Sequence, residues 1–374
     1  MKIGIDISQI VYGTGVSRYT EELVRRLAKV DKKNQYLLLF SSLRQKVPGS
    51  ILQLVDKNKN FELKAFKFPP TFLEFLWNRL HVVNIEKFLG DVDVFHSWDW
   101  YQPPTKAKKV TTVHDVSFLH YPEVFPKRTI RTQTNRLYWV KKEVDLVIAD
   151  SKATKNDLVE LLGFDEKKIK VIYLGVSDSW KEKPVNINKL KVIKKKYKIK
   201  GEYILSVGTL EPRKNIKSVI KAFDELKKSN LKLVLVGKLG WGGDIKKITE
   251  KIDSGVVVTG FIPDEDLAPL YQGAHCFVYP SLYEGFGLPV LEAMASGTPV
   301  ITSNVSSLLE IAGEAALLVD PEKTSEITKA MKKIIESKSL RRELSAKGKK
   351  QAAKFTWEKT AQQTLTAYKQ LVKG

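Results

Sequence analysis

The feature that most constrains this chain is an alternation of short β-branched segments with helical segments, which occurs twice and is broken once. In the first half, sequence typical of a helix runs from about residue 18 to 30. Strands are expected at 2–7, 36–40, 92–96, 110–114, 146–149 and 171–173. Strands that alternate with helices predict a doubly wound parallel sheet with crossover helices.

Lys- and Asn-rich sequence between residues 180 and 200 interrupts this alternation, and a new strand begins at Tyr203. A chain of 374 residues with 43% hydrophobic side chains is also too long for one typical core. We therefore expect an N-terminal domain over 1–180 and a C-terminal domain over 181–355, each built on a doubly wound sheet. Further strands of the second domain are expected at 231–236, 256–259, 276–279, 300–302 and 316–319.

Composition narrows the function classes. The 63 Lys and Arg residues exceed the 42 Asp and Glu residues, both halves are basic, and the net charge is +21, so anionic partners are expected. No apolar run approaches the length of a membrane span, and the first residues do not resemble a signal peptide, so we expect a cytoplasmic protein. The single cysteine, Cys276, argues against disulfides, a Cys-based metal site and redox chemistry.

The densest glycine and proline pattern follows the strand at 276–279. Pro289 suits a first helical position and Gly297 the position past a helix end, so a short helix is expected from Pro289 to Ser296. It starts at the carboxyl edge of a parallel sheet, where such folds bind ligands.

Two carboxylates flank the start of this helix, Glu284 in the loop and Glu292 one turn in. Backbone N–H groups around Gly287 and Leu288 lie between them at the positive helix end. The arrangement suits a sugar nucleotide, with amides for phosphates and carboxylates for ribose and hexose hydroxyls. The alternative is that Glu284 is a solvated loop residue and Glu292 a helix-surface acid.

Two cations, Arg213 and Lys214, follow the strand that begins at Tyr203 and precede a helix expected near Asn215. Fixed cations at a carboxyl strand end can neutralise a diphosphate leaving group without a metal. The alternative is a solvated pair on a basic surface.

A glycine-containing turn, Gly13-Thr14-Gly15, joins the first strand to the first helix. Such a turn lets backbone N–H groups approach an anion, or it is a plain tight turn. Arg18 stands where a dinucleotide fingerprint has its third glycine, and no Gly-Lys-Ser or Gly-Lys-Thr closes a P-loop. A dehydrogenase and a P-loop enzyme are therefore not favoured.

Together these motifs resemble the retaining glycosyltransferases of family 4 over most of the chain. The resemblance rests on Glu284 and Glu292 with seven residues between them, on the motif Gly-Thr-Leu-Glu-Pro-Arg-Lys-Asn at 208–215, and on Gly13-Thr14-Gly15. Within the family, the motif at 208–215 resembles the corresponding sequence of bacterial mannosyltransferases that build surface polysaccharides. The resemblance implies the GT-B fold: two facing Rossmann-like domains, with a C-terminal helix over 356–374 crossing back to the first domain.

The resemblance also implies roles. Arg213 and Lys214 would hold the diphosphate, Glu284 the donor hexose and Glu292 the ribose, with Gly15 facing the diphosphate. His114, at the end of a strand, matches a family histidine near the transferred sugar. The expected catalytic residues are His114, Glu284, Arg213 and Lys214. The expected donor-binding residues are Gly15, Arg213, Lys214, Glu284, Gly285, Phe286, Gly287, Leu288 and Glu292.

The implied activity is the retaining transfer of a hexose, mannose from GDP-mannose, to a glycan or lipid-linked acceptor in cell-surface polysaccharide synthesis. No cofactor and no metal are expected, because Asp91-Val92-Asp93 precedes a strand and so lies at the amino edge, away from the ligand side. The expected mechanism is front-face departure, with the leaving diphosphate taking the acceptor proton. Alternatives are a UDP- or ADP-glucose-dependent glucosyltransferase, a nucleotide-sugar epimerase or a phosphorylase on the same fold, and a non-enzymatic basic surface-binding protein.

Four further features bear on the partners and on the site. Six of the 24 residues in 66–89 are Phe or Trp, and this segment either rests on anionic lipid at the inner face of the cell membrane or packs on its own domain. No nucleic-acid-binding motif is present, so no nucleic-acid partner is expected. His96 is a weaker candidate for the acceptor side, and Leu309 stands where the family has a proline.

Overall fold

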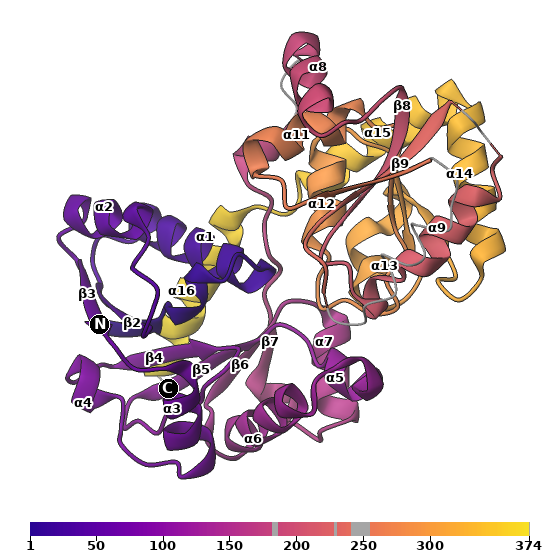
Figure 1. Ribbon diagram of the computed structural model, residues 1–374. Helices are drawn as coiled ribbons and strands as arrows, with labels where there is room; N and C mark the ends of the chain where they lie inside the picture. Colours follow the sequence, from indigo (N-terminus) through magenta and orange to yellow (C-terminus); the bar gives the residue numbers. More distant parts are fainter. Residues whose placement is uncertain (182–185, 228–229, 241–254, 374) are drawn as a thin grey trace. The chain divides into compact units, whose positions relative to one another are not determined.

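A computed structural model describes residues 1–181, 186–227, 230–240 and 255–373, which form two compact units (Figure 1). Unit 1 comprises Met1–Gly175 and Thr356–Gly374, and unit 2 comprises Val176–Phe355. The chain thus leaves unit 1 five residues before the predicted boundary at 180 and returns at the predicted point. The expected C-terminal helix ends at Lys373, and Gly374 lies outside the described residues.

Unit 1 is built on a seven-stranded parallel sheet in the order β3-β2-β1-β4-β5-β6-β7. Its strands are β1 (Lys2–Asp6), β2 (Gln35–Ser41), β3 (Phe61–Phe66), β4 (Val94–Trp98), β5 (Lys108–Val113), β6 (Leu146–Ala149) and β7 (Ile169–Val171). All predicted strands of this half are confirmed, to within a few residues. The sequence Phe-Glu-Leu-Lys-Ala-Phe of β3 was missed because it contains no β-branched residue, which is tolerated at a sheet edge.

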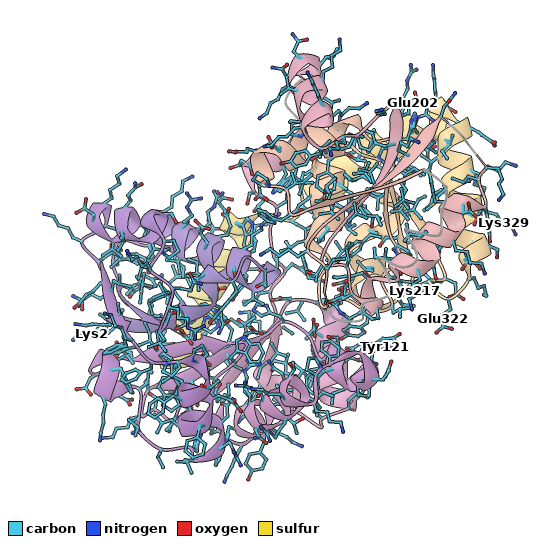
Figure 2. All side chains as sticks on the ribbon, in the orientation of Figure 1. Lys2, Tyr121, Glu202, Lys217, Glu322 and Lys329 are labelled. Atoms are coloured by element: carbon cyan, nitrogen blue, oxygen red, sulfur yellow. The ribbon has the colours of Figure 1, made fainter. Side chains whose placement is uncertain are left out.

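Helices cover both faces of this sheet, with α1, α2 and α16 on one side and α6 on the other (Figure 1). The helices are α1 (Gly15–Val30), α2 (Gly49–Lys57), α3 (Pro70–Glu74), α4 (Glu86–Leu89), α5 (Ser117–His120), α6 (Lys127–Glu143), α7 (Lys152–Glu160) and α16 (Trp357–Lys373). Asp93 marks the amino edge, because its carboxylate accepts the N–H of Lys2 (2.7 Å), the first residue of β1 (labelled in Figure 2). The predicted place of the Asp91-Val92-Asp93 motif is therefore confirmed.

Unit 2 repeats the design with six parallel strands in the order β10-β9-β8-β11-β12-β13. The strands are β8 (Glu202–Val207), β9 (Leu231–Val236), β10 (Val256–Gly260), β11 (Phe277–Tyr279), β12 (Val300–Ser303) and β13 (Leu317–Val319). The helices are α8 (Ile187–Lys196), α9 (Ile216–Asp224), α11 (Asp264–Gly273), α12 (Leu288–Ala295), α13 (Ser306–Ala312), α14 (Thr324–Glu336) and α15 (Lys338–Ala352). Short 3-10 turns lie at Ser8–Val11, Pro122–Val124, Glu166–Lys168, Asp178–Trp180, Pro212–Lys214 and Gly313–Ala315, and a π-helical turn at Phe75–Arg79.

The C-terminal helix α16 is part of the core of unit 1. The hydroxyl of Tyr368 bonds Nδ1 of His96 (2.6 Å), and Nε2 of His96 bonds the hydroxyl of Thr112 (2.8 Å). Thr112 in turn bonds the hydroxyl of Tyr19 on α1 (2.9 Å). Burial lowers the pKa of His96 to about 3, so it is a neutral core residue. The hypothesis that His96 lines the acceptor side is wrong.

The aromatic segment 66–89 packs mostly on its own unit. Trp77 is buried, and Phe88 meets it edge-on (5.6 Å between ring centroids) and also meets Phe66 (5.3 Å). Phe72 and Phe75 differ from these packed aromatic residues, because each of them is 44% exposed. No helix among the described residues is long and apolar enough to cross a membrane.

Replacing Tyr368 with Phe tests the link between α16 and the sheet. The change leaves Nδ1 of the buried His96 without its partner, which costs about 1–3 kcal/mol and a fall of several degrees in Tm. Thermal unfolding measures it, with Tyr138→Phe as the control because the Tyr138 side chain is 58% exposed. Equal Tm changes in the two variants would contradict the proposed link.

Candidate active site

The two predicted cations and Glu284 meet at the carboxyl edge of the sheet in unit 2. Arg213 and Lys214 lie in the 3-10 turn after β8, and Glu284 lies in the loop after β11. These two strands are neighbours and run parallel, so the segments that follow them emerge at the same edge. The N–H of Leu282 also donates to the carbonyl of Arg213 (2.9 Å) and joins the two loops.

Glu284 is buried among partners of opposite charge. Its Oε1 accepts from Nζ of Lys214 (2.5 Å) and from the hydroxyl of Tyr279 (2.9 Å). Its Oε2 lies 3.0 Å from Nη1 of Arg213. Nη2 of Arg213 pairs with Oε1 of Glu211 (2.7 Å). Two carboxylates and two cations thus form one buried, charge-balanced cluster, and the solvated interpretations of Glu284 and of the Arg-Lys pair are wrong.

This cluster sets the ionisation of its members. Burial alone would raise the pKa of Glu284, but the charges of Arg213 and Lys214 outweigh it and lower that pKa to about 2. Burial and the repulsion from Arg213 lower the pKa of Lys214. The Glu284 carboxylate is therefore a hydrogen-bond acceptor at every physiological pH.

The loop that carries Glu284 is fixed by two serines that the sequence reasoning missed. Ser306 accepts the backbone N–H of Glu284 (3.0 Å), and Ser307 donates to its carbonyl (2.8 Å). Both lie at the start of α13, beside the motif in which Leu309 replaces a proline. Leu309 itself is 48% exposed and lies inside the helix.

Helix α12 begins and ends within one residue of the predicted limits. Gly287 precedes it with φ +102°, and a Cβ there would lie 2.7 Å from Cδ2 of Leu308, so a side chain does not fit. Phe286 and Leu288 are buried on either side. Glu292 is 4% exposed and accepts from the hydroxyl of Tyr271 on α11 (3.3 Å). Glu292 is thus no surface acid, while its contact with a ribose stays a prediction.

In unit 1, His114 follows β5 and pairs with Asp150, which follows the neighbouring strand β6. Nδ1 of His114 lies 2.7 Å from Oδ2 of Asp150, and the ring of Tyr19 packs edge-on at 4.8 Å. Burial opposes the charged imidazole, but the Asp150 carboxylate outweighs it and raises the pKa of His114. Nε2 of His114 is buried and has no hydrogen-bond partner within the described residues.

More carboxylates gather at this edge than the sequence reasoning found. An aspartate stands at the end of each of four strands that are adjacent in the sheet, or within two residues of it. These residues are Asp6 at the end of β1, Asp99 after β4, Asp115 after β5 and Asp150 after β6. Burial and the nearby Asp99 raise the pKa of Asp6 to about 6. The signal that would have found them is an aspartate after each of four consecutive strands of one sheet.

Several buried polar atoms beside these carboxylates are unsatisfied. Within the described chain, Oδ1 of Asp150, the hydroxyl of Tyr101 and Nε of Arg136 have no hydrogen-bond partner. Buried polar groups are normally paired, so these atoms have hydrogen-bonding capacity that water or a polar ligand can use.

The Gly13-Thr14-Gly15 turn forms a regular helix start. Thr14 caps α1, because its hydroxyl accepts the N–H of Ser17 (3.3 Å) while the Ser17 hydroxyl accepts the N–H of Thr14 (3.2 Å). Gly13 has φ +67°, and Gly15 is exposed with no atom within 4 Å of a Cβ built there. The contact of Gly15 with a donor stays a prediction.

Known proteins match along the whole chain. The family described as Glycosyltransferase Family 4 matches residues 13–180, and the family described as Glycosyl transferases group 1 matches 186–351. An O-antigen chain mannosyltransferase B of Escherichia coli is 33% identical over 99% of this chain and 100% of its own. The chain belongs to glycosyltransferase family 4.

Solved structures agree with the fold of this glycosyltransferase. Sucrose-phosphate synthase from Thermosynechococcus elongatus aligns with a TM-score of 0.79 at 20% identity over 99% of both chains. WaaG, a glycosyltransferase involved in lipopolysaccharide biosynthesis, aligns with a TM-score of 0.72 at 15% identity over 97% of this chain and 98% of its own. The two Rossmann-like units are those of the GT-B fold.

Replacing Glu284 with Gln tests the buried charge cluster. The pKa of Glu284 lies below its ordinary value of 4.5, so the ionised group stabilises the fold above that pH and loses its contribution as the pH falls toward about 2. At neutral pH the variant should lose on the order of 3 kcal/mol, and the difference from wild type should shrink near pH 3. Urea unfolding at both pH values measures this difference. Glu322→Gln is the control, because Glu322 is exposed and points away from unit 2 (Figure 2), and a pH-independent cost would contradict the cluster.

Replacing Asp150 with Asn tests the histidine pair. Without the carboxylate, burial and the positive charge of Arg136 should move the pKa of His114 from above 6.5 to below it. An NMR titration of the imidazole signals reports this, with His120 and His275 as internal controls. A pKa of His114 that stays above 6.5 would show that Asp150 does not hold its proton.

Proposed function

We propose that this glycosyltransferase transfers mannose from GDP-mannose to a glycan or lipid-linked acceptor in cell-surface polysaccharide synthesis, with retention of configuration. The observation that carries the proposal is the buried cluster of Glu284, Arg213 and Lys214, the residues to which the family resemblance assigns donor binding. The full-length similarity to an O-antigen chain mannosyltransferase supports the choice of sugar.

The cluster can serve both parts of a nucleotide sugar. Lys214 and Arg213 offer N–H donors and positive charge to the diphosphate, and Glu284 accepts hydroxyl protons of the hexose. The same cations also pair with Glu284, so contacts with phosphate would compete with these internal ion pairs. Because the cations supply the charge that a leaving diphosphate needs, we propose a reaction that requires no metal.

Retention is proposed to follow a front-face path. The bond between the anomeric carbon and the diphosphate oxygen breaks, the acceptor hydroxyl forms the new bond on the same face, and its proton passes to the departing diphosphate. Glu284 is poorly suited to be a covalent nucleophile, because both of its carboxylate oxygens are held by cations or by Tyr279.

The carboxylates of unit 1 support binding of the acceptor. Asp6, Asp99 and Asp150 can accept hydroxyl protons of a sugar, and Tyr101 and Nε2 of His114 have unused hydrogen-bonding capacity. We propose that these groups hold the neutral terminal sugar of a glycan, with His114 nearest to the transferred hexose.

We also propose that the enzyme works in the cytoplasm at the inner face of the cell membrane. The proposal is supported by Phe72, Phe75 and Leu80, which expose large apolar side chains on one short segment of a basic protein. Such residues can enter the boundary of an anionic bilayer.

Thermal unfolding with GDP, UDP and ADP, each with and without EDTA, tests the donor. A nucleotide that binds only the folded protein at about a hundredfold excess over Kd stabilises it by about 2.7 kcal/mol, a shift of several degrees. We expect a shift with GDP that EDTA does not change. A shift with UDP or ADP alone would favour a glucosyltransferase, and no shift with any nucleotide would contradict the donor site.

The variant Glu292→Gln tests the ribose assignment within the same assay. It keeps the shape of the side chain but removes charge from the acceptor of two ribose hydroxyls, so nucleotide affinity should fall by about tenfold, or about 1.4 kcal/mol. Glu322→Gln should leave affinity unchanged. Lys214→Ala is a less clean test, because it also breaks a buried ion pair and lowers stability. Full nucleotide affinity in Glu292→Gln would show the ribose role to be wrong.

A further inference from the structure

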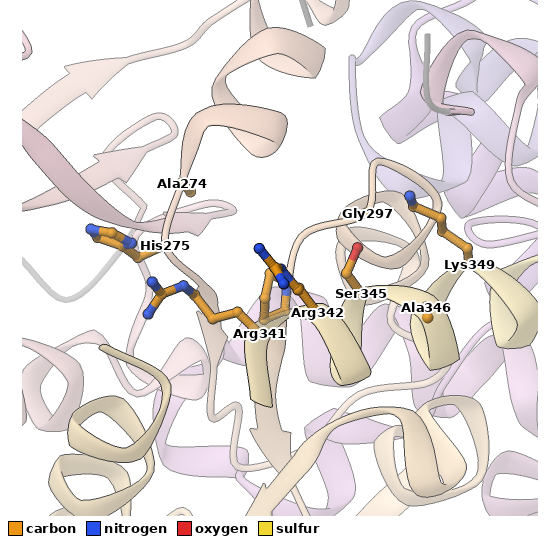
Figure 3. A pocket seen from close by; sticks show the side chains of 9 residues that line it. Ala274, His275, Gly297, Arg341, Arg342, Ser345, Ala346 and Lys349 are labelled. Carbon is orange, nitrogen blue, oxygen red and sulfur yellow. The ribbon is translucent and has the colours of Figure 1, made fainter. Parts of the chain in front are cut away.

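A pocket of roughly 410 Å³ lies at the amino edge of the sheet in unit 2, opposite to the edge that carries Glu284 (Figure 3). Two of its walls are the segments that lead into β11 and β12, represented by His275 and Gly297. The third wall is helix α15. The pocket is therefore a separate feature from the donor site and is independent of its assignment.

Helix α15 presents a row of donors to this pocket. Arg341, Ser345 and Lys349 are spaced four residues apart and so share one helix face, and Arg342 stands beside them. None of the nine described residues that line the pocket is acidic. Three cationic side chains and a hydroxyl thus face the same space with no carboxylate among them.

Gly297 brings two of these donors together. It follows α12 with φ +78°, and a Cβ there would lie 3.3 Å from Nζ of Lys349 and 3.2 Å from Oγ of Ser345. A side chain at this position would therefore displace the lysine, whose Cε would be only 2.7 Å away. Because Gly297 has no side chain, the ammonium group of Lys349 and the hydroxyl of Ser345 can lie side by side at the pocket wall.

The arginines complete the set in different ways. Nη1 of Arg341 donates to the carbonyls of Ile334 and Ile335 (2.5 and 2.8 Å) near the end of α14, which fixes its guanidinium in place. Arg342 is exposed and makes no hydrogen bond or ion pair within the described part of the chain. The nearby Glu202 carboxylate lies 3.0 Å from Nε2 of His275 and is also attracted by Arg341, but it is not among the residues that line the pocket.

We propose that this pocket is a second anion site and binds a phosphate group, either of a soluble phosphate compound or of a lipid headgroup. Guanidinium groups match the geometry of phosphate oxygens through paired N–H donors, and Lys349 and Ser345 add a point charge and a neutral donor. Because the Arg341 side chain is already held in place, the entropic cost of binding a ligand is lower.

The test compares two double variants of the full chain that each remove two positive charges. Arg342→Gln with Lys349→Gln alters the pocket, and Lys329→Gln with Lys332→Gln alters exposed positions on α14 (Lys329 is labelled in Figure 2). Pyrophosphate binding is measured by calorimetry. Vesicle binding is measured by flotation with phosphatidylcholine, with and without phosphatidylglycerol. The donor site and the exposed aromatics of unit 1 are intact in both variants, so their contributions cancel.

We expect the pocket variant to lose at least about tenfold in affinity, or about 1.4 kcal/mol, in one of the two arms while the control variant stays near wild type. Loss of pyrophosphate binding identifies a soluble phosphate ligand, and loss confined to anionic vesicles identifies a lipid headgroup. Ser345→Glu, which places a carboxylate in the pocket, should reproduce the loss with an unchanged Tm. Equal losses in the two double variants would assign the effect to overall charge and overturn the proposal. No loss in either arm would show that the pocket does not bind phosphate and would overturn it as well.

Discussion

The ion pairs of Glu284 with Lys214 and Arg213 are the interaction on which the candidate active site of unit 2 depends. A buried carboxylate without partners would cost several kcal/mol, so the loops after β8 and β11 must hold their cations and their acid at matched positions. Backbone bonds from Ser306 and Ser307 then fix the loop of Glu284 to α13. The need to pair a buried carboxylate thus organises three segments of unit 2.

The two units use the same geometry to bring together different sets of charged residues. In each, parallel strands end at one edge and deliver the residues that follow them to a common place. Unit 2 delivers two cations with their carboxylates, whereas unit 1 delivers four aspartates and a histidine. Helix α16 supports the second arrangement from within the core, because Tyr368, His96, Thr112 and Tyr19 form a continuous chain of hydrogen bonds that ends against the ring of His114.

Hydrophobic periodicity and the positions of Gly and Pro predicted every strand except β3, the limits of α12 and the edge at which Arg213, Lys214 and Glu284 meet. These features depend on local sequence, as Pro289 and Gly297 show. The partners of each side chain could not be predicted in the same way, because they depend on which strands become neighbours. His114 was expected from its strand end, but Asp150 lies 36 residues further along the chain and becomes its partner only through the pairing of β5 with β6. His96 was misjudged for the same reason, since its burial is completed by α16 at the far end of the sequence.

The distribution of charge also explains how a protein with a net charge of +21 can distinguish its ligands. A uniformly basic surface would attract every anion, but Lys214 and Arg213 are paired with Glu284 and Glu211, so an anion that binds them competes with these carboxylates. This favours a ligand that compensates Glu284 with hydroxyl groups while it supplies phosphate to the cations, which describes a sugar diphosphate better than a simple anion. The aspartates of unit 1 weaken the attraction of anions to that edge, which fits the neutral sugar proposed for it. Local carboxylates, rather than the overall excess of lysine and arginine, therefore set what each site accepts.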